Sequence, residues 1–408
     1  MELIGHVKNY EWGKLGDESY VARIAAANQT DGTFVVDANK PYAELWMGTH
    51  CSGPSLVKQS GLELGSVIRP QEQPTYLFKV LSIQKALSIQ LHPNKMEATA
   101  LHAKFPDIYK DPNHKPELAI ALTEFKAMCG FRRYTDIYSQ LQNWPELQAL
   151  LGADEIAKTN VPEDEENYEV REVMRNLYSS LMNLEPEQLE KCISSMHNKI
   201  LAKPEKSSLD QLFLELHNDF GSDVGLLSIY FLNVLDLQPG QSIYLAANVP
   251  HAYIRGDCVE CMSCSDNVVR AGLTPKFKDI ETLLRLVEVK SASPESLMCE
   301  PIVKDPKRQP YTRTYCPNDP WLLEFSVSML TVPPGVNDYP ITNGINGSIL
   351  LVTAGKGTLR GNVKNITVQF GSIVFLSSEA GAELQLWRNS EDLNEEFVAY
   401  LAMQREKV

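Results

Sequence analysis

The segment Ala86–Lys95, ALSIQLHPNK, places an amide and an imidazole two residues apart. Neighbouring side chains of a β-strand point to opposite faces, so residues two apart share a face. Gln90 and His92 therefore point to one side together with Ser88, while the intervening apolar residues point to the other. Taken alone, this pattern is more typical of an amphipathic strand with its polar face in water, so further polar segments are needed to favour a binding site.

Two further segments carry side chains that bind metals. In NHKPELAIAL, Lys115 and Glu117 share a face with two alanines, which leave room beside the carboxylate. Pro116 predicts an edge strand or an irregular strand start, because proline cannot donate to a ladder. In NVPHAYIRGD, His251 follows a proline at a predicted strand start. We therefore predict that two imidazoles, one carboxylate and one amide oxygen converge: His92, His251, Glu117 and Gln90.

This set of donors suits an electrophilic metal ion. Two neutral imidazoles and a carboxylate are good Zn²⁺ ligands at about 2.0–2.2 Å, and a glutamine carbonyl can supply the fourth. One carboxylate leaves a net charge of about +1 at the metal, which can polarise a substrate oxygen, whereas a thiolate-rich site would quench it. The same donors also suit Fe(II) or Mn²⁺, so zinc is favoured over two alternatives.

The polarity pattern predicts which elements position these residues. Residues 1–134 alternate short apolar runs with turn residues, which predicts a mostly β region. Residues 135–223 have apolar side chains at helical spacing, with acidic helix starts such as PEDEE and PEQLE, and are predicted to be a helical insertion. Strand patterns return in residues 224–305, around one helix predicted at DIETLLRLVEVK, and continue through residues 306–408. We predict a mainly β protein with a helical insertion.

A weak internal repeat links the two later β regions. Ile243–Tyr253 and Val374–Leu384 align at one constant offset, and both resemble a strand, a small-residue loop and another strand. His251 falls opposite Ala382, so a ligand in the first unit is absent from the second. Two related β-barrels, only one of which carries a site, would fit this pattern.

The composition limits the partners. A chain of 408 residues suits two or three domains, and its net charge of −14 disfavours nucleic acid and anionic membranes. A phosphate substrate would therefore require a local cluster of Lys and Arg. Because the sequence has no long apolar tract and no signal-like start, we expect a cytoplasmic protein. Eight irregularly spaced cysteines, including the three of CVECMSC, predict neither a disulfide framework nor a metal cluster.

Five segments together resemble the type I mannose-6-phosphate isomerases, also called phosphomannose isomerases. The resemblance spans residues 1 to about 280, and one small departure is Cys51, where a proline would be expected. The segments are YEWG (Tyr10–Gly13), AELWMGTH (Ala43–His50), SIQLHPNK (Ser88–Lys95), HKPELAIAL (His114–Leu122) and VPHAYIRGD through SDNVVRAGLTPKFKD (Val249–Asp279).

The resemblance implies two cupin-like (jelly-roll) β-barrels plus an α-helical domain. The catalytic cupin domain would comprise residues 1–134 and 224–305, with the insertion at 135–223 and a C-terminal cupin-like domain without a metal site at 306–408. It implies one Zn²⁺ per chain held by the four predicted ligands, and a monomer. It also implies a role in supplying mannose for GDP-mannose and glycosylation precursors.

For the site, the resemblance implies a catalytic arginine at Arg270. Other residues that it places in the site or at the phosphate are Ser88, Lys115, Tyr253, Glu260 and Lys276. Moving a proton between C1 and C2 through a cis-enediol requires an electrophile, a base and a phosphate anchor. Glu260 is the preferred base and Lys115 an alternative, while His114 or Lys115 is expected to assist ring opening. Lys276 and Ser88 are expected to anchor the phosphate.

Two other classes of function remain open. Another cupin enzyme, such as an Fe(II) dioxygenase, would use the same ligands but would not require Arg270 or Lys276. A sugar- or metal-binding cupin without catalysis would largely keep its function after replacement of Arg270.

Overall fold

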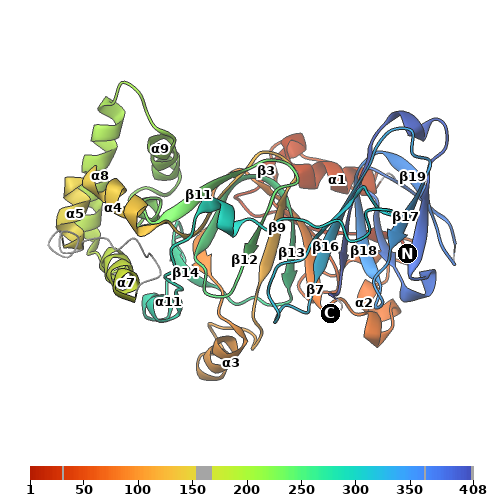
Figure 1. Ribbon diagram of the computed structural model, residues 1–408, viewed down its shortest axis with the longest axis horizontal. Coiled ribbons are helices and arrows are strands. Elements are labelled where there is room, and N and C mark those ends of the chain that lie inside the picture. The colour runs from red at the N-terminus through yellow and green to blue at the C-terminus, as the bar shows by residue number, and fades with distance from the viewer. Residues whose placement is uncertain (30–31, 153–167, 363, 406–408) are drawn as a thin grey trace.

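The computed structural model describes residues 1–29, 32–152, 168–362 and 364–405. Its long axis runs from a helical end through a central β region to a second β region (Figure 1). The predicted helix start PEDEE lies outside the described residues. Among the described helices, none is long and apolar enough to cross a membrane.

A ten-stranded antiparallel sheet forms the central region. Its main path runs in the order β11-β10-β13-β7-β5-β2, and two branches leave β13, one through β9 to β12 and one through β8 to β14. The pairings between these strands form open branches and not a closed ring. The strands are β2 (His6–Lys8), β5 (Glu44–Met47), β7 (Tyr76–Ile83), β8 (Ile89–Leu91), β9 (Glu117–Ala121), β10 (Phe125–Phe131), β11 (Leu232–Leu237), β12 (Ser242–Leu245), β13 (His251–Ser263) and β14 (Val269–Gly272).

One glycine allows β13 to pair with strands in two parts of this sheet. The first five residues of β13 pair with β10, whereas the strand from Gly256 onward pairs with β7 and β9. Gly256 has a φ of +112°, a conformation that L side chains rarely adopt. A Cβ at this position would lie 2.4 Å from the carbonyl oxygen of Glu124. The bend in β13 therefore requires glycine.

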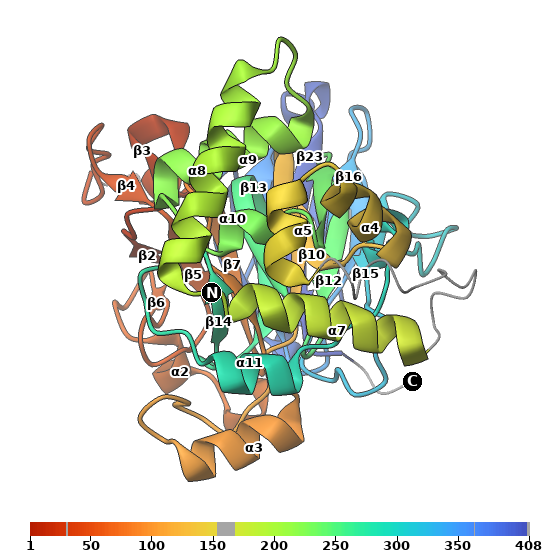
Figure 2. The same ribbon diagram turned by 90° about the vertical axis from the view of Figure 1, so that its left-hand side faces the viewer.

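Six helices in the described residues form the helical insertion, which confirms that part of the predicted fold. One hydrophobic core joins them to the central sheet, and α5, α7 and α8 face the viewer in Figure 2. Pro186, from the predicted start PEQLE, is the first residue of α8, where its missing N–H is not needed. The helices are α4 (Tyr134–Gln142), α5 (Pro145–Leu151), α7 (Tyr168–Met182), α8 (Pro186–Ala202), α9 (Ser208–Phe220) and α10 (Gly225–Ser228).

Besides one four-residue helix, two longer helices interrupt the region predicted to be mostly β. They are α1 (Tyr20–Asn28), which packs against β5 and β7, and α3 (Lys95–Lys104), which follows β8. Capping residues signal both: the Ser19 side chain caps α1, and Asn94 and Glu97 form a capping box at α3. The predicted helix after β14 is confirmed as α11 (Ile280–Leu286). The remaining short elements are α2 (Leu64–Val67), β1 (Leu3–Ile4), β3 (Lys14–Leu15), β4 (Pro41–Tyr42) and β6 (Leu56–Val57).

The C-terminal region consists of two antiparallel sheets with a hydrophobic core between them. The first has the order β15-β16-β23-β18-β21 and the second β17-β22-β19-β20. The strands are β15 (Thr312–Tyr315), β16 (Ser326–Val332), β17 (Asp338–Thr342), β18 (Ser348–Ala354), β19 (Lys356–Arg360), β20 (Ile366–Gln369), β21 (Ile373–Leu376), β22 (Glu383–Trp387) and β23 (Phe397–Met403).

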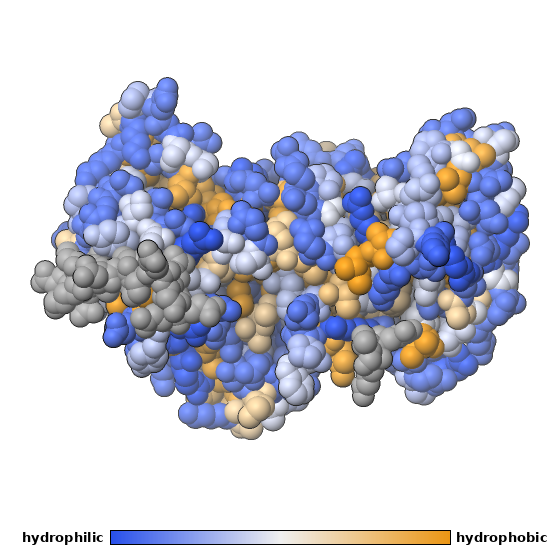
Figure 3. Space-filling view, viewed as in Figure 1, coloured by the Kyte–Doolittle hydropathy of each residue, from blue (hydrophilic) through white to orange (hydrophobic). Residues whose placement is uncertain are grey.

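The five-stranded sheet is buried on both faces. Residues of β16 alternate between the inner core, as Leu330 does, and a second core, as Val327 and Met329 do. This second core also contains side chains of the central sheet, such as Phe78 and Val259. The two β regions therefore share one hydrophobic interface, while hydrophilic residues cover most of the face shown in Figure 3.

The local pattern of the predicted repeat agrees with the observed elements. Ile243 lies in β12 and Val374 in β21, and a loop follows each strand. Strand β13 then begins at His251, and β22 begins directly after Ala382. The common origin of the two units stays a prediction.

The bend in β13 predicts a large cost for Gly256→Ala. We expect the free energy of unfolding to fall by about 3 kcal/mol, because a non-glycine residue would combine an unfavourable φ with a clash against backbone atoms. Gly335 is the control: its φ is +83° and an added Cβ would meet nothing within 4 Å. Gly335→Ala should cost about 1 kcal/mol. Equal losses in denaturant unfolding would contradict the steric explanation.

Glu72 predicts a pH-dependent contribution to stability. It accepts hydrogen bonds from Arg69, Ser377 and Ser378, and so links the central and C-terminal regions. The Arg69 guanidinium leads the effects that lower the pKa of Glu72 to about 2. This value lies below the unfolded value of about 4.3, so the stabilisation is present above that pH and is lost as the pH falls toward 2.

We expect Glu72→Gln to cost about 1–2 kcal/mol at neutral pH, since the partly exposed Arg69 is screened by solvent. The difference from the unaltered protein should shrink as the pH falls from 5 toward 2, by about the same amount in total. Glu379→Gln is the control, because Glu379 also pairs with Arg69 but is 67% exposed. A difference for Glu72→Gln that is independent of pH would contradict the assignment.

Candidate functional site

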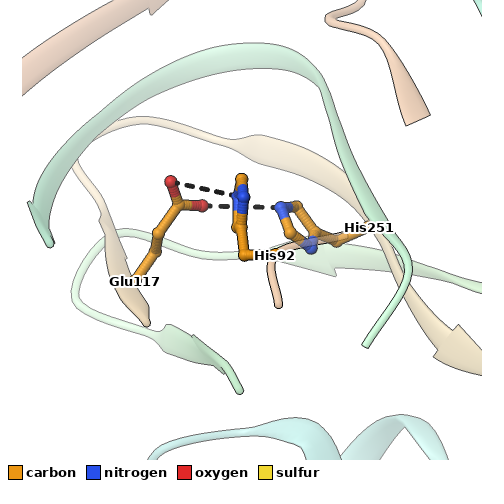
Figure 4. A group of neighbouring side chains, drawn as sticks. All are labelled: His92, Glu117 and His251. Atoms are coloured by element: carbon orange, nitrogen blue, oxygen red, sulfur yellow. Dashed lines mark ion pairs between the residues drawn. The ribbon is translucent and has the colours of Figure 1, made fainter. Parts of the chain in front are cut away.

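The side chains of His92, Glu117 and His251 meet at one buried point (Figure 4). Nε2 of His92 lies 3.4 Å from Oε1 of Glu117, and Nε2 of His251 lies 3.4 Å from Oε2. The residues come from the loop after β8 and from the first positions of β9 and β13. The strand start predicted after Pro116 is observed, although β9 pairs on both sides and is not an edge strand.

The hydrogen bonds of the two imidazoles indicate that a cation fits between them. Nδ1 of His92 lies 2.7 Å from the carbonyl oxygen of Asn267, and Nδ1 of His251 lies 2.9 Å from that of Val249. Because a carbonyl only accepts, each Nδ1 carries a proton, and in a neutral imidazole Nε2 then presents a lone pair. Both Nε2 atoms are buried without a hydrogen-bond partner and face the carboxylate of Glu117.

Such an arrangement of electron pairs is repulsive unless a cation lies among them. Two ligands at about 2.0–2.1 Å from a tetrahedral Zn²⁺ lie about 3.3–3.4 Å apart, which agrees with the two observed separations. The residues therefore fit a metal ion of this size.

Gln90 lies beside this group on β8. Its backbone is paired with that of His251 in β13 on one side and with that of Arg270 in β14 on the other. Directly opposed residues of antiparallel strands place their side chains on the same face. Ser88 Oγ donates to Oε1 of Gln90 at 3.4 Å, so that oxygen faces the same side as Ser88. Gln90 is therefore placed to supply a fourth donor.

The charges of the group suit metal ligands. Burial, followed by the positive charge of Lys115, lowers the pKa of His92 to about 4, so this imidazole is neutral at physiological pH. Burial alone would raise the pKa of Glu117, but Lys115, whose Nζ lies 3.0 Å from Oε1, leads the effects that hold it well below its usual range. Glu117 is therefore ionised.

A second buried group surrounds Glu260, on the far side of the bend in β13. Tyr253 donates to Oε1 of Glu260 at 2.9 Å, and Nζ of Lys79 lies 3.1 Å from Oε2. Burial is the main effect that raises the pKa of Glu260, and Lys79 opposes it. Glu260 is thus enclosed, and both of its oxygens have partners.

Lys79 was not predicted from the sequence. It is 6% exposed, lies directly opposite Glu260 on β7, and is 3.9 Å from Glu44. Burial alone would lower its pKa, but Glu44 and Glu260 raise it well above the usual range, so Lys79 is charged. The sequence did contain a signal for Lys79, because a single lysine within the apolar run YLFKVLSI must have a buried partner.

A cavity of about 760 Å³ lies next to the metal group. Four of the predicted residues line it: Ser88, Gln90, Arg270 and Lys276. Lys85 and aromatic side chains of the motif YEWG also line it, as do Asp219, Phe220 and Asp223 at the helical end. Burial lowers the pKa of Arg270, which remains a cation. The cavity therefore brings Gln90, which is paired with His251, next to three cations and next to the carboxylates of Glu11, Asp219 and Asp223.

Seven predicted residues do not line this cavity: His92, Glu117 and His251 of the metal group, and Tyr253, Glu260, His114 and Lys115. Lys115 is paired with Glu117, and His114 lies at the boundary between the two β regions. Nε2 of His114 is 2.6 Å from Oε1 of Glu324, a residue of the C-terminal region. Sequence reasoning did not identify this partner, which is 210 residues away.

Comparison with known proteins agrees with the geometry. The family model "Phosphomannose isomerase type I, catalytic domain" matches residues 1–134, and "Phosphomannose isomerase type I, helical insertion domain" matches residues 150–232. Mannose-6-phosphate isomerase 2 of Arabidopsis thaliana is 41% identical, and the alignment covers 91% of this chain and 88% of the relative. The mannose-6-phosphate isomerase of Bos taurus is 38% identical, with 93% and 94% covered.

Solved structures extend the likeness to the whole fold. An arginine-to-alanine variant of phosphomannose isomerase from Salmonella typhimurium has a TM-score of 0.81 at 26% identity, with 99% of both chains covered. A mannose 6-phosphate isomerase bound with zinc and yttrium has the same score, identity and coverage. The chain therefore belongs to the type I phosphomannose isomerase family.

Proposed function

We propose that the protein interconverts D-mannose 6-phosphate and D-fructose 6-phosphate through a cis-enediol, with one Zn²⁺ per chain held by Gln90, His92, Glu117 and His251. The observation that carries the proposal is the meeting of two imidazole Nε2 atoms with one carboxylate, each 3.4 Å from one of its oxygens, close to Gln90 and the cavity that it lines. The names of the relatives supply the substrate.

The metal contributes one kind of chemistry in this proposal. A bound Zn²⁺ with a net charge of about +1 stabilises the negative charge that develops on the sugar oxygens during enolisation. The cavity meets the ligand set at Gln90, so the reacting end of the sugar would lie at that edge.

Two cations are proposed to bind different parts of the substrate. Arg270 is paired through its backbone with Gln90, and its half-buried guanidinium would orient the oxygens on C1 and C2. Lys276 is exposed at the cavity and would bind the 6-phosphate with the hydroxyl of Ser88. Both cations line the cavity and would attract a phosphate locally, against the carboxylates of Glu11, Asp219 and Asp223 in the same lining.

Glu260 remains the proposed proton carrier, and both of its oxygens are bonded to other side chains. A raised pKa favours a carboxylate that can take up a proton, but the contacts with Tyr253 and Lys79 must yield to substrate. Lys115 is the alternative base, and it is engaged with Glu117. His114, held by Glu324, is proposed to assist ring opening.

The finer features of the family resemblance stay proposals. They are cupin-like barrels at 1–134 with 224–305 and at 306–408, a helical insertion at 135–223, a monomeric state, and a supply of mannose for GDP-mannose. The two-sheet C-terminal region and the insertion support this division.

Removal of the metal should abolish the activity. Treatment with a chelator should stop conversion of mannose 6-phosphate, and Zn²⁺ should restore it, while circular dichroism shows that the fold is retained. Fe(II) with O₂ should give no oxidised product, in contrast to a dioxygenase. Full isomerase activity in a verified metal-free preparation would contradict the proposed mechanism.

Replacement of Arg270 should affect turnover more than substrate affinity. We expect Arg270→Ala to lower kcat by about 10²–10³-fold, with KM changed only a few-fold, because its contacts strengthen as charge develops. Arg270→Lys should recover only part of kcat, since lysine lacks the planar fork. Lys276→Ala should instead raise KM. An unchanged kcat in Arg270→Ala would remove this residue from the mechanism and favour a binding protein.

A further inference from the structure

The loop between β13 and β14 contains an asparagine that is only 1% exposed, Asn267. Loops lie on surfaces because their polar groups need partners, so a fully buried loop asparagine must be bonded within the protein. Its amide nitrogen donates to the carbonyl oxygens of Asp111 at 2.6 Å and Asn113 at 2.9 Å. The amide orientation is fixed, because the reverse would place its oxygen against these two carbonyls.

Further hydrogen bonds join the same loop to the segment 111–113, and one lies within the loop. Ser265 Oγ accepts from the backbone N–H of Asn267 and donates to the carbonyl oxygen of Asn113. The side chain of Asp111 accepts from the N–H of Asp266. The loop is therefore held at several points by the segment that continues into Glu117.

The same loop also contacts a candidate metal ligand, His92. The backbone carbonyl of Asn267 accepts the Nδ1 proton of His92 at 2.7 Å. This bond selects the tautomer that leaves Nε2 unprotonated, and it fixes the direction of the ring. Such partners of metal ligands are typically worth 10–100-fold in metal affinity. The side chain of Asn267 thus holds the loop whose carbonyl holds His92.

We propose that Asn267 is a positioning residue that sets the metal affinity of the site by holding His92 against the segment that carries Glu117. The proposal rests on the metal centre of the proposed function. Asn267 itself would contact neither the metal nor the substrate.

The test compares Asn267→Ala with a matched asparagine. Asn343 is 3% exposed, and its amide donates to the carbonyl oxygens of Ser377 and Gly381 in the C-terminal region. Zinc affinity is measured by competition with a chromogenic chelator, which needs no substrate, and the thermal midpoint is measured alongside. We expect Asn267→Ala to raise the Kd for zinc about 10–100-fold and Asn343→Ala to change it less than two-fold.

Activity at saturating zinc is the second readout. Because Asn267 acts through His92, excess Zn²⁺ should restore most of the kcat of Asn267→Ala. If this variant does not fold, Ser265→Ala should still weaken zinc binding several-fold. Unaltered zinc affinity in either folded variant, or equal weakening by Asn343→Ala, would overturn the proposal. Failure of the unaltered protein to bind zinc would instead overturn the metal centre itself.

Discussion

The bend of β13 at Gly256 is the constraint on which the site depends. A single strand supplies His251 before the bend and Glu260 after it, and Tyr253, before the bend, donates a hydrogen bond to Glu260. A straight strand would hold His251 and Glu260 farther apart. Because a Cβ at Gly256 would overlap the backbone of Glu124, this geometry depends on the absence of a side chain.

Charged neighbours, acting with or against burial, set the charges. The imidazole of His92 is neutral and Glu117 is ionised, although both are almost fully buried, because Lys115 favours both states. In the neighbouring group, Lys79 stays charged between Glu44 and Glu260. Each buried charge therefore has a specific partner, which is the condition for keeping ions in a low-dielectric interior. The cavity lining of this negatively charged protein combines three cations, Lys85, Arg270 and Lys276, with the carboxylates of Glu11, Asp219 and Asp223.

Short-range patterns predicted much of this site. Strand alternation placed Gln90 and His92 on one face, and a proline marked the start of β9 at Glu117. The period of apolar residues predicted the helical insertion, whereas α1 and α3 were missed because their capping residues were not weighed. The partners of the predicted residues were not predictable, since Glu324 and Asn267 lie 210 and 175 residues from the histidines they hold. Such contacts arise only when the chain has folded, and no local periodicity encodes them.

The doubly buried sheet of the C-terminal region makes that region an obligatory part of the molecule. One of its faces closes its own core, and the other shares a core with the strands that carry the site. A truncated chain ending before β15 would expose a broad apolar surface to water and would lose Glu324, the partner of His114. The C-terminal region thus covers apolar side chains of the central sheet and is needed for the fold. A chain that ends at the boundary between the two β regions would not be a smaller working enzyme.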